Sequence, residues 1–237
     1  MKKLCKWICF WVVLIFLFLI TTLYVLCYAN GYRINWQAKK IQKTGMIIVT
    51  SIPPRVGVFV DGIQKDVTPV RISYVLPGKH DVELKIEGYQ VWTQSVNVEA
   101  GYVVSLDADL FYNKSKISAY TDKQIDYTLS EQPLIKKDTE IWSDNKNLVT
   151  RLSKPVLTAI WSKDKKNIFY QTDNEIRVIS AEGIHDCLIL KLDTADMVNL
   201  YMLSANQLVY KQNEVQKVIE FRGRVSFWPS TIKYLNF

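Results

Sequence analysis

The sequence has few of the residues on which most active sites depend. Its 237 residues include two histidines, His80 and His185, which excludes a three-histidine metal site. Only one of its four cysteines, Cys187, lies beyond residue 27, so the larger part of the chain has no disulfide or four-cysteine zinc site of its own. No phosphate-binding loop, dinucleotide-binding glycine motif, nucleophile elbow or His-Glu-x-x-His motif occurs. We therefore expect neither an enzyme nor a cofactor.

Acidic residues are absent from the first sixty positions, which contain eight lysines and arginines. The whole chain has 30 basic and 23 acidic side chains, a net charge of +7 and a pI near 9.1. Beyond residue 60, the balance is 22 basic against 23 acidic side chains. The basic character therefore belongs to one end, and we expect no nucleic-acid-binding face on the folded part. A hydrophobic content of 49% excludes a disordered chain.

Charge is also absent between Lys6 and Arg33, where the sequence is almost entirely apolar. A helix over the 22 residues from Trp7 to Tyr28 reaches about 33 Å, enough to cross a hydrocarbon core of about 30 Å. We therefore predict a transmembrane helix over residues 7–28. Aromatic residues are expected at its two membrane interfaces, with those at the second interface on one helical face. They are Trp7 and Trp11 at one end, and Tyr24, Tyr28, Tyr32 and Trp36 at the other.

A cleaved secretory signal is the main alternative to a permanent anchor. Its apolar region is expected to span only about 7–15 residues and to end at a small-x-small cleavage site, which residues 27–29 do not provide. A lipoprotein signal is disfavoured because Leu26 precedes Cys27. Basic residues flank both sides of the helix, and we expect a signal anchor of the cell membrane because a first helix usually acts as one. Residues 1–6 are then a cytoplasmic tail, residues 29–44 a basic juxtamembrane linker, and the remainder extracytoplasmic.

From residue 45 the pattern changes to the alternation of half-buried strands. Residues 80–86 place valine, leucine and isoleucine on one face and charged side chains on the other. Residues 56–60 alternate in the same way before Asp61-Gly62, a strong hairpin-turn signal, and residues 104–110 repeat the pattern. Short strands at this spacing predict a small antiparallel sandwich.

Several motifs of this segment occur in a characteristic order. They are Gly45–Ser51, Pro53-Pro54, Val58–Gly62, Thr68-Pro69, Leu76–His80 and Gly88-Tyr89. In order and spacing, residues 45–111 resemble the PEGA domain. The resemblance implies a transthyretin-like antiparallel β-sandwich of the kind found in membrane-anchored and surface-layer-like proteins, and it brings no known catalytic residue. One departure is Pro54-Arg55-Val56-Gly57, which stands where the family shows Pro-x-Gly-Ala.

The motif residues also have structural explanations. Gly62 permits a positive φ in a tight turn, and Tyr89 with Trp92 is expected to cap one end of the sandwich. His80 is expected to be a turn or edge histidine, with a metal or proton-transfer role as the alternative. The full set of motif residues is Pro53, Pro54, Asp61, Gly62, Thr68, Pro69, Pro77, Gly78, His80, Gly88 and Tyr89.

Residues 114–237 contain an internal repeat. Residues 167–179 align with residues 207–218 if one residue is dropped, and residues 138–142 form a weaker third copy of part of the unit. A period near 40 with two strands and a turn predicts propeller-like blades. Residues 161–170 also resemble the Trp-Ser-x-Asp unit of TolB-like and WD-repeat-like propellers. The blade residues that we single out are Trp161, which is expected to fill the space between blades, with Ser162, Asp164, Tyr170 and Tyr210.

The length of this segment is too short for a closed ring. At about 40 residues per blade, 124 residues make about three blades, whereas closed propellers typically have about 4–8. We expect an open arc, a ring completed by another chain, or a shortened relative of a longer protein. An open arc leaves unpaired sheet edges, so association with a second copy or another partner is expected.

Three smaller patterns have both a chemical and a structural interpretation. Asp107 and Asp109 are spaced to share a solvent face and to bind a cation, but a solvated face is the simpler interpretation. The His185-Asp186-Cys187 sequence is a candidate thiol site only if the fold brings those side chains together. Cys5 and Cys9 share a helix face where acylation is conceivable, although small apolar residues are expected there without it.

These observations favour a mostly β, membrane-anchored extracytoplasmic protein that binds or scaffolds. Its expected partners are the lipid bilayer, an envelope polymer, a surface-layer or envelope protein, or a second copy of the chain. The alternatives are an envelope hydrolase or transferase with its active site in propeller loops, and a single-pass ligand sensor. A tail of six residues is too short for a signalling domain and disfavours the sensor.

Overall fold

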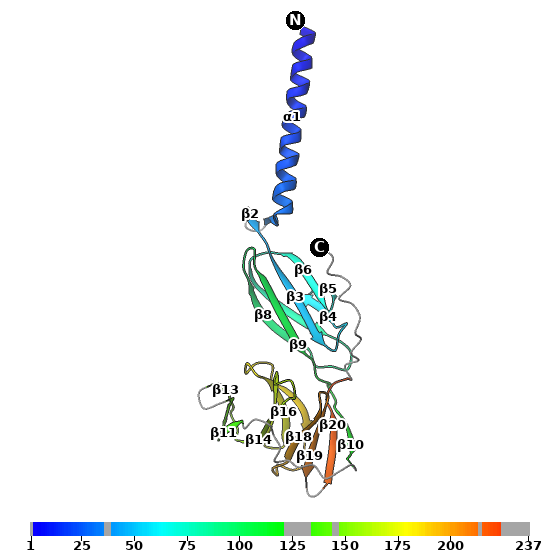
Figure 1. The fold of residues 1–237 in the computed structure, drawn as a ribbon, viewed down its shortest axis with the longest axis vertical. Coiled ribbons are helices and arrows are strands. Elements are labelled where there is room, and N and C mark those ends of the chain that lie inside the picture. Colours follow the sequence, from blue (N-terminus) through cyan, green and yellow to red (C-terminus); the bar gives the residue numbers. More distant parts are fainter. Residues whose placement is uncertain (1, 36–38, 121–133, 144–146, 213–214, 224–237) are drawn as a thin grey trace. The chain divides into compact units, whose positions relative to one another are not determined.

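A computed structural model describes residues 2–35, 39–120, 134–143, 147–212 and 215–223 (Figure 1). These residues contain one helix and twenty strands. The chain divides into two compact units. The first comprises residues 1–50, 57–83 and 94–108, and the second comprises residues 51–56, 84–93 and 109–237.

Helix α1 (Lys2–Ala29) contains the whole predicted transmembrane span. Its segment Phe10–Ala29 has a mean hydropathy of 2.7 and is long and apolar enough to cross a membrane, and no part of it is buried inside the protein. The hydroxyls of Thr21 and Thr22 donate to carbonyls one turn earlier in the helix, so they are not left unpaired in an apolar setting. The helix ends where Asn30 Nδ2 donates to Leu26 O.

A short hairpin follows the helix within the segment predicted as a linker. It is built from β1 (Tyr32–Asn35) and β2 (Lys40–Lys43), which pair antiparallel. Gly31 makes the turn from helix to strand. Its φ of 81° is a backbone conformation that a residue with a Cβ rarely adopts. Tyr32 therefore lies on a strand and does not continue the helical face of Tyr24 and Tyr28, which corrects the prediction of one helical face. Trp36 lies outside the described residues.

Seven strands follow in two sheets. The first sheet has the order β6-β3-β9 and the second the order β5-β4-β7-β8. Their bounds are β3 (Gly45–Ile52), β4 (Gly57–Val60), β5 (Ile63–Val67), β6 (Val70–Val75), β7 (Gly78–Lys85), β8 (Trp92–Val98) and β9 (Val103–Asp109). The predicted alternation is confirmed on β7, where Val82 and Leu84 are fully buried, and on β9, where Leu106 and Ala108 are buried.

The hairpin predicted at Asp61-Gly62 is also confirmed. Asp61 and Gly62 separate β4 from β5 and have φ values of 52° and 76°. Positive φ at both central positions gives the turn a twist that matches the right-handed twist of its strands.

The pairing of β3 with β9 corrects the prediction of an entirely antiparallel arrangement. Met46 N–H donates to Tyr102 O at 3.0 Å, and Leu110 N–H donates to Ile52 O at 2.9 Å. Residue numbers therefore rise together along both strands, so the two run parallel. Alternation did not reveal this, because an edge strand with one buried face shows the same pattern in either direction.

The second unit contains three further sheets, with the orders β11-β12-β13, β14-β15-β16-β17 and β10-β20-β19-β18. Neighbouring strands within each of them pair antiparallel. The bounds are β10 (Lys116–Ala119), β11 (Ile135–Lys137), β12 (Glu140–Trp142), β13 (Leu148–Arg151), β14 (Val156–Trp161), β15 (Asn167–Thr172), β16 (Glu175–Ser180), β17 (Cys187–Lys191), β18 (Asn199–Ser204), β19 (Gln207–Gln212) and β20 (Val215–Glu220).

The repeat inferred from the sequence corresponds to two equivalent hairpins. β15 and β19 begin 40 positions apart, and so do β16 and β20. The dropped residue in the sequence alignment is therefore unnecessary, which corrects that detail. The weaker third copy is the β11-β12 hairpin, whose turn residue Asp138 has a positive φ of 50°, as Asp173 has 52° in the β15-β16 turn.

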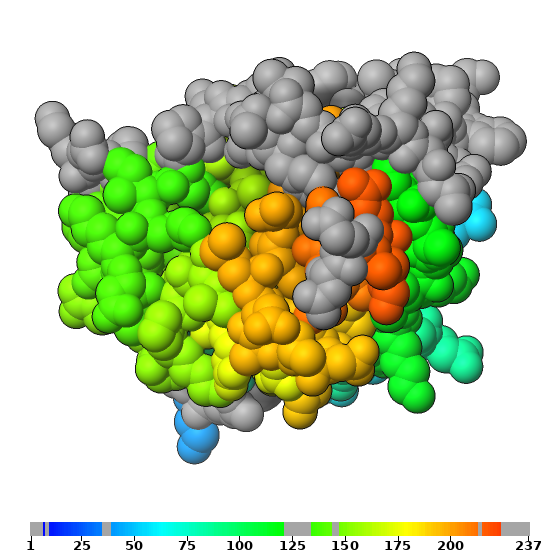
Figure 2. Space-filling model, turned by 90° about the horizontal axis from the view of Figure 1, so that it is seen from below, coloured from blue at the N-terminus to red at the C-terminus, as the bar shows by residue number. Residues whose placement is uncertain are grey.

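The last of these three sheets is completed by β10, the earliest of their strands in the chain. β10 precedes all the other strands of this region in the chain, yet it pairs along β20 at the far end of the sequence. β14 contacts β11 and β12 of one neighbouring sheet and β18 of the other, so the middle sheet lies beside both. Figure 2 shows the three sheets side by side on one face, with β10 in green beside β20 in orange-red. Among the described strands, no sheet closes on itself.

Candidate functional site

The described residues contain no group of three or more histidine, cysteine, aspartate or glutamate side chains placed to hold a metal ion. The His185-Asp186-Cys187 sequence does not form a thiol site. His185 stacks on Trp92 with ring centroids 4.5 Å apart, and burial lowers its pKa. Burial raises the pKa of the Cys187 thiol, which keeps it protonated and weakly nucleophilic at neutral pH.

Asp186 belongs instead to an ion-pair network. Its Oδ1 accepts a hydrogen bond of 2.8 Å from the buried Tyr170 hydroxyl, and Arg177 contacts both of its carboxylate oxygens through Nε at 3.1 Å. Arg177 also pairs with Glu175 at 2.9 Å. The pKa of Tyr170 is raised, first by burial and then by the neighbouring Asp186 carboxylate. These groups link the middle strands of one sheet to the loop that precedes β17.

A second network surrounds Arg222, whose side chain is 4% exposed. Its Nη1 lies 3.2 Å from Asp109 Oδ1, its Nη2 lies 3.8 Å from Asp164 Oδ2, and its Nε donates to Ala205 O at 2.9 Å. Asn167 Nδ2 donates to the other Asp109 oxygen at 2.5 Å. Burial raises the pKa of Asp109, and the charge of Arg222 opposes that rise.

This arrangement corrects the interpretation of Asp107 and Asp109 as a solvated pair. The Asp109 side chain is 12% exposed and pairs with Arg222, whereas Asp107 Oδ1 accepts a hydrogen bond from the Thr50 hydroxyl. The ion pair could not be predicted from the sequence, because its partners lie far apart along the chain and neither belongs to a recognisable motif.

The predicted blade motif builds a turn that is part of the same network. The Ser162 hydroxyl donates to Asp164 Oδ1 at 2.6 Å and accepts from Asn167 N–H at 3.0 Å, while Lys166 N–H donates to Asp164 Oδ1. The turn thus satisfies its own polar groups and presents the second Asp164 oxygen to Arg222.

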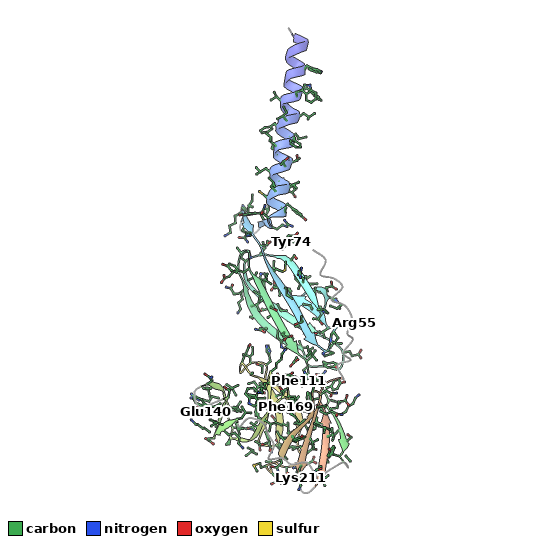
Figure 3. The ribbon with its side chains drawn as sticks, viewed as in Figure 1. Arg55, Tyr74, Phe111, Glu140, Phe169 and Lys211 are labelled. Atoms are coloured by element: carbon green, nitrogen blue, oxygen red, sulfur yellow. The ribbon has the colours of Figure 1, made fainter. Side chains whose placement is uncertain are left out.

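The apolar members of the blade motif belong to two core clusters. Trp161, which is half-buried, packs against a cluster of Ile141, Val156, Ile168, Tyr170 and Ile179, drawn from two different sheets. Tyr210 lies in a second cluster with Phe111, Phe169 and Phe221. The rings of Phe111 and Phe169 meet edge to face with centroids 6.4 Å apart (Figure 3).

The motif residues of the first strands make structural contacts. His80 Nδ1 lies 2.6 Å from Asp61 Oδ2, and Nε2 lies 2.8 Å from Leu76 O, which ties together two turns. Thr68 is buried, and Ser51 Oγ donates to Pro53 O. The remaining motif residues occupy turns, edges and strand ends, namely Pro54, Gly62, Pro69, Pro77, Gly78 and Gly88.

Tyr89 does not join Trp92 as the predicted cap. It packs on Tyr112 with ring centroids 4.7 Å apart, and its hydroxyl accepts a hydrogen bond of 3.3 Å from Gly223 N–H. Trp92 instead stacks on His185. Both aromatics therefore pack within the second unit, because residues 84–93 belong to it.

The aromatics predicted at the membrane interfaces are exposed where they are described. Trp7 and Trp11 meet edge to face at 5.9 Å, and Tyr24 and Tyr28 lie 6.2 Å apart, as expected for residues one helical turn apart. A further contact was not predicted. The Arg33 guanidinium lies 3.6 Å from the Tyr28 ring centroid and 3.8 Å from that of Tyr74.

Comparison with known families agrees with the geometry of the seven strands between residues 45 and 109. Residues 44–112 match the PEGA domain family. This segment is a PEGA domain. The match extends one residue beyond each predicted boundary and covers 69 of the 237 residues. A search of curated proteins finds no match to the chain. The PEGA domain indicates an extracellular or envelope-associated module, and its described motif residues form turns and packing contacts.

Proposed function

We propose that this protein is a membrane-anchored, extracytoplasmic binding or scaffolding protein of the cell envelope that acts without catalysis. The observation that carries the proposal is the succession of an apolar helix ending at Ala29 and a PEGA domain beginning at residue 44. An envelope-associated module placed fifteen residues after a spanning helix is held at the surface of the membrane that contains the helix. Residues 1–6 are then cytoplasmic, and the domains beyond the helix are extracytoplasmic.

We propose further that the two sheets of the PEGA domain form a transthyretin-like sandwich and that residues 114–237 form an open arc of three propeller-like blades. Alternating burial along β7 and β9 supports the sandwich. The arc is supported by the two equivalent hairpins and by β10, which supplies the outer strand of the last sheet. Because β10 comes from the beginning of the repeat region and pairs with β20 at its end, the two ends of the repeat region are held together.

The partners of such an arc are an envelope polymer, an envelope protein or a second copy of the chain. The PEGA and blade motif residues contribute to turns, ion pairs and packing, which favours recognition by surface contact over chemistry. Three blades present sheet edges that a second chain can pair with. Sedimentation of the full-length protein in detergent tests self-association, and a single monomeric species across micromolar concentrations would count against it.

Protease accessibility in intact cells tests the proposed topology. With a C-terminal epitope tag, residues beyond 44 are expected to be digested without lysis, while a cytoplasmic marker stays intact. Digestion only after lysis would overturn the orientation.

A pair of helix variants tests the anchor itself. Leu17→Arg with Leu19→Arg raises the insertion cost by roughly 5 kcal/mol or more and is expected to prevent stable insertion. The matched Leu17→Ile with Leu19→Ile keeps the helix apolar and is expected to stay in the membrane fraction. Equal membrane retention of both variants would contradict an anchor formed by this helix.

A further inference from the structure

The hairpin after the helix has one exposed apolar face. Directly paired residues of antiparallel strands share a face, and the pairs here are Tyr32 with Lys43 and Ile34 with Ile41. Tyr32, Ile34 and Ile41 are 42%, 50% and 67% exposed, although they occupy one side of a two-stranded element. A contiguous apolar face of this kind in water is unfavourable unless something covers it.

The opposite face of the hairpin is already occupied. Arg33 and Gln42 form the pair between the two apolar pairs and are both half-buried. The Arg33 guanidinium lies between the rings of Tyr28 and Tyr74, the first at the end of α1 and the second on β6. Gly31 O accepts hydrogen bonds from Thr44 N–H and Oγ1 at 3.0 and 2.8 Å. The hairpin is therefore tied to both neighbours, and its exposed face has a fixed direction.

The turn between β8 and β9 brings further exposed apolar side chains near the hairpin. The side chain of Lys43 lies against Gly101, and Gly101 N–H donates to Thr44 O. Beside this contact, Tyr102 and Val103 are 66% and 55% exposed. We name these five exposed residues the juxtamembrane patch, which consists of Tyr32, Ile34, Ile41, Tyr102 and Val103.

The position of the patch and the charges beside it indicate what it contacts. The apolar segment Phe10–Ala29 spans about 30 Å, the thickness of a hydrocarbon core, so the residues after Ala29 enter the headgroup layer. Tyr32 follows Ala29 by three residues. Lys39 and Lys40, at the start of β2, are exposed, and no acidic residue occurs before Asp61. Apolar rings and aliphatic side chains beside lysines match an anionic lipid surface.

We propose that the juxtamembrane patch lies on the surface of the bilayer that holds α1 and contacts its anionic headgroups. Through this contact the hairpin binds the membrane in addition to α1. The two attachments together fix the orientation of the first unit relative to the bilayer. The proposal rests on the membrane anchor proposed above.

Fluorescence quenching by brominated lipids tests the proposal in the full-length protein. Bimane is attached to Ile41→Cys in a background with Cys5, Cys9, Cys27 and Cys187 replaced by alanine, in vesicles that contain brominated phosphatidylcholine and phosphatidylglycerol. Two controls are labelled in the same way, Leu19→Cys within the helix and Arg55→Cys beyond the far end of β3. We expect the label at position 41 to be quenched less than the label at position 19, which lies in the middle of the span, but clearly more than the label at position 55, which is expected to be unaffected.

The controls separate this proposal from the anchor on which it rests. If position 19 is quenched while position 41 behaves like position 55, the anchor stands and the patch does not contact lipid, which overturns the inference. If position 19 is unquenched as well, the anchor fails and the inference fails with it.

Charge substitutions test the preference for anionic headgroups. Lys39→Gln with Lys40→Gln is expected to reduce quenching at position 41, with a loss of about fivefold per lysine in the docking equilibrium. The matched pair Lys136→Gln with Lys137→Gln removes two adjacent lysines of β11 and is expected to leave quenching unchanged. Equal behaviour of the two variants, or equal quenching in vesicles without phosphatidylglycerol, would overturn the headgroup assignment.

Discussion

His80 shows how one PEGA motif residue acts through hydrogen bonds. Both ring nitrogens face acceptors, Asp61 Oδ2 and Leu76 O, so both carry a proton when the two contacts are satisfied. Burial alone lowers the pKa of His80, but the Asp61 and Leu76 contacts outweigh it and raise the pKa. Burial likewise raises the pKa of Asp61, and its bonds to His80 and Asp81 N–H outweigh that effect and lower it. The Asp81 carboxylate and Lys65 also act on this pair.

The pair is expected to give a pH-dependent contribution to stability. The His80 contribution is complete below its unfolded pKa of 6.5 and is lost as pH rises through the raised folded value. The Asp61 contribution is lost as pH falls through a value below 3.8. Replacing His80 with Gln is expected to cost about 1 kcal/mol near pH 6, a modest amount because Asp61 is half exposed.

Urea unfolding of the full-length protein in detergent, followed between pH 5 and 9, measures this difference. The difference in free energy of unfolding between wild type and His80→Gln is expected to narrow as pH rises. The control His185→Gln removes a histidine whose pKa is lowered by burial. The difference in free energy of unfolding between wild type and this control is expected not to narrow as pH rises. A gap that is constant across the range would contradict a charged His80.

At the scale of elements, local patterns predicted individual strands but not their partners. The alternation of residues 80–86 and the Asp61-Gly62 turn are properties of neighbouring residues, and both predictions are confirmed. The β1-β2 hairpin was missed because its strands are four residues long and contain one arginine and two lysines, so the segment resembled a basic linker. The parallel partner of β3 and the pairing of β10 with β20 depend on distant segments, which alternation does not encode.

Introducing proline into β10 tests the role of that strand as the last member of its sheet. Ser118 pairs with Val218. Its N–H faces β20, because hydrogen-bonded pairs alternate along an antiparallel ladder and Tyr120 N–H, two residues on, donates to Gln216 O. A proline at position 118 removes this N–H and restricts the backbone of a four-residue strand. We expect Ser118→Pro to lower the exchange protection of residues 215–220 by roughly tenfold, the effect of losing one or two ladder bonds at about 1 kcal/mol each. Hydrogen–deuterium exchange with mass spectrometry measures the change.

The matched variant Ser118→Thr keeps the N–H and the hydroxyl at this exposed position, so it is expected to preserve protection. Unchanged protection of residues 215–220 in Ser118→Pro would mean that β10 does not stabilise the last sheet.

At the scale of the whole molecule, part of the PEGA segment belongs to the same compact unit as the residues that follow it. Residues 51–56, 84–93 and 109–112 of the matched segment belong to the second compact unit. Phe111 lies in the core cluster with Phe169 and Phe221, and Tyr112 N–H donates to Phe221 O at 2.8 Å. The sequence marked a boundary between residues 111 and 114, because motifs end there, whereas the packing continues across it.

Removing one member of the buried Asp109–Arg222 pair tests this integration. Asp109→Asn leaves Arg222 buried without its nearest counter-charge, and we expect a loss of about 3 kcal/mol in the free energy of unfolding. The double variant Asp109→Asn with Arg222→Met removes both charges and is expected to recover much of that loss. Urea unfolding of the full-length wild type and of both variants measures these changes.

Asp107→Asn is the matched control, since it changes an exposed aspartate two positions away and is expected to shift stability by less than about 0.5 kcal/mol. Equal effects of Asp107→Asn and Asp109→Asn, or no recovery in the double variant, would contradict a stabilising role for the buried pair.

The proposed function depends most on the permanence of α1 in the membrane. Intact-mass measurement of the protein that remains in membranes after a carbonate wash tests this directly. We predict a polypeptide that retains residues 2–29 and resists extraction. A mature chain that begins after Ala29, or that is released by the wash, would contradict the proposed anchor.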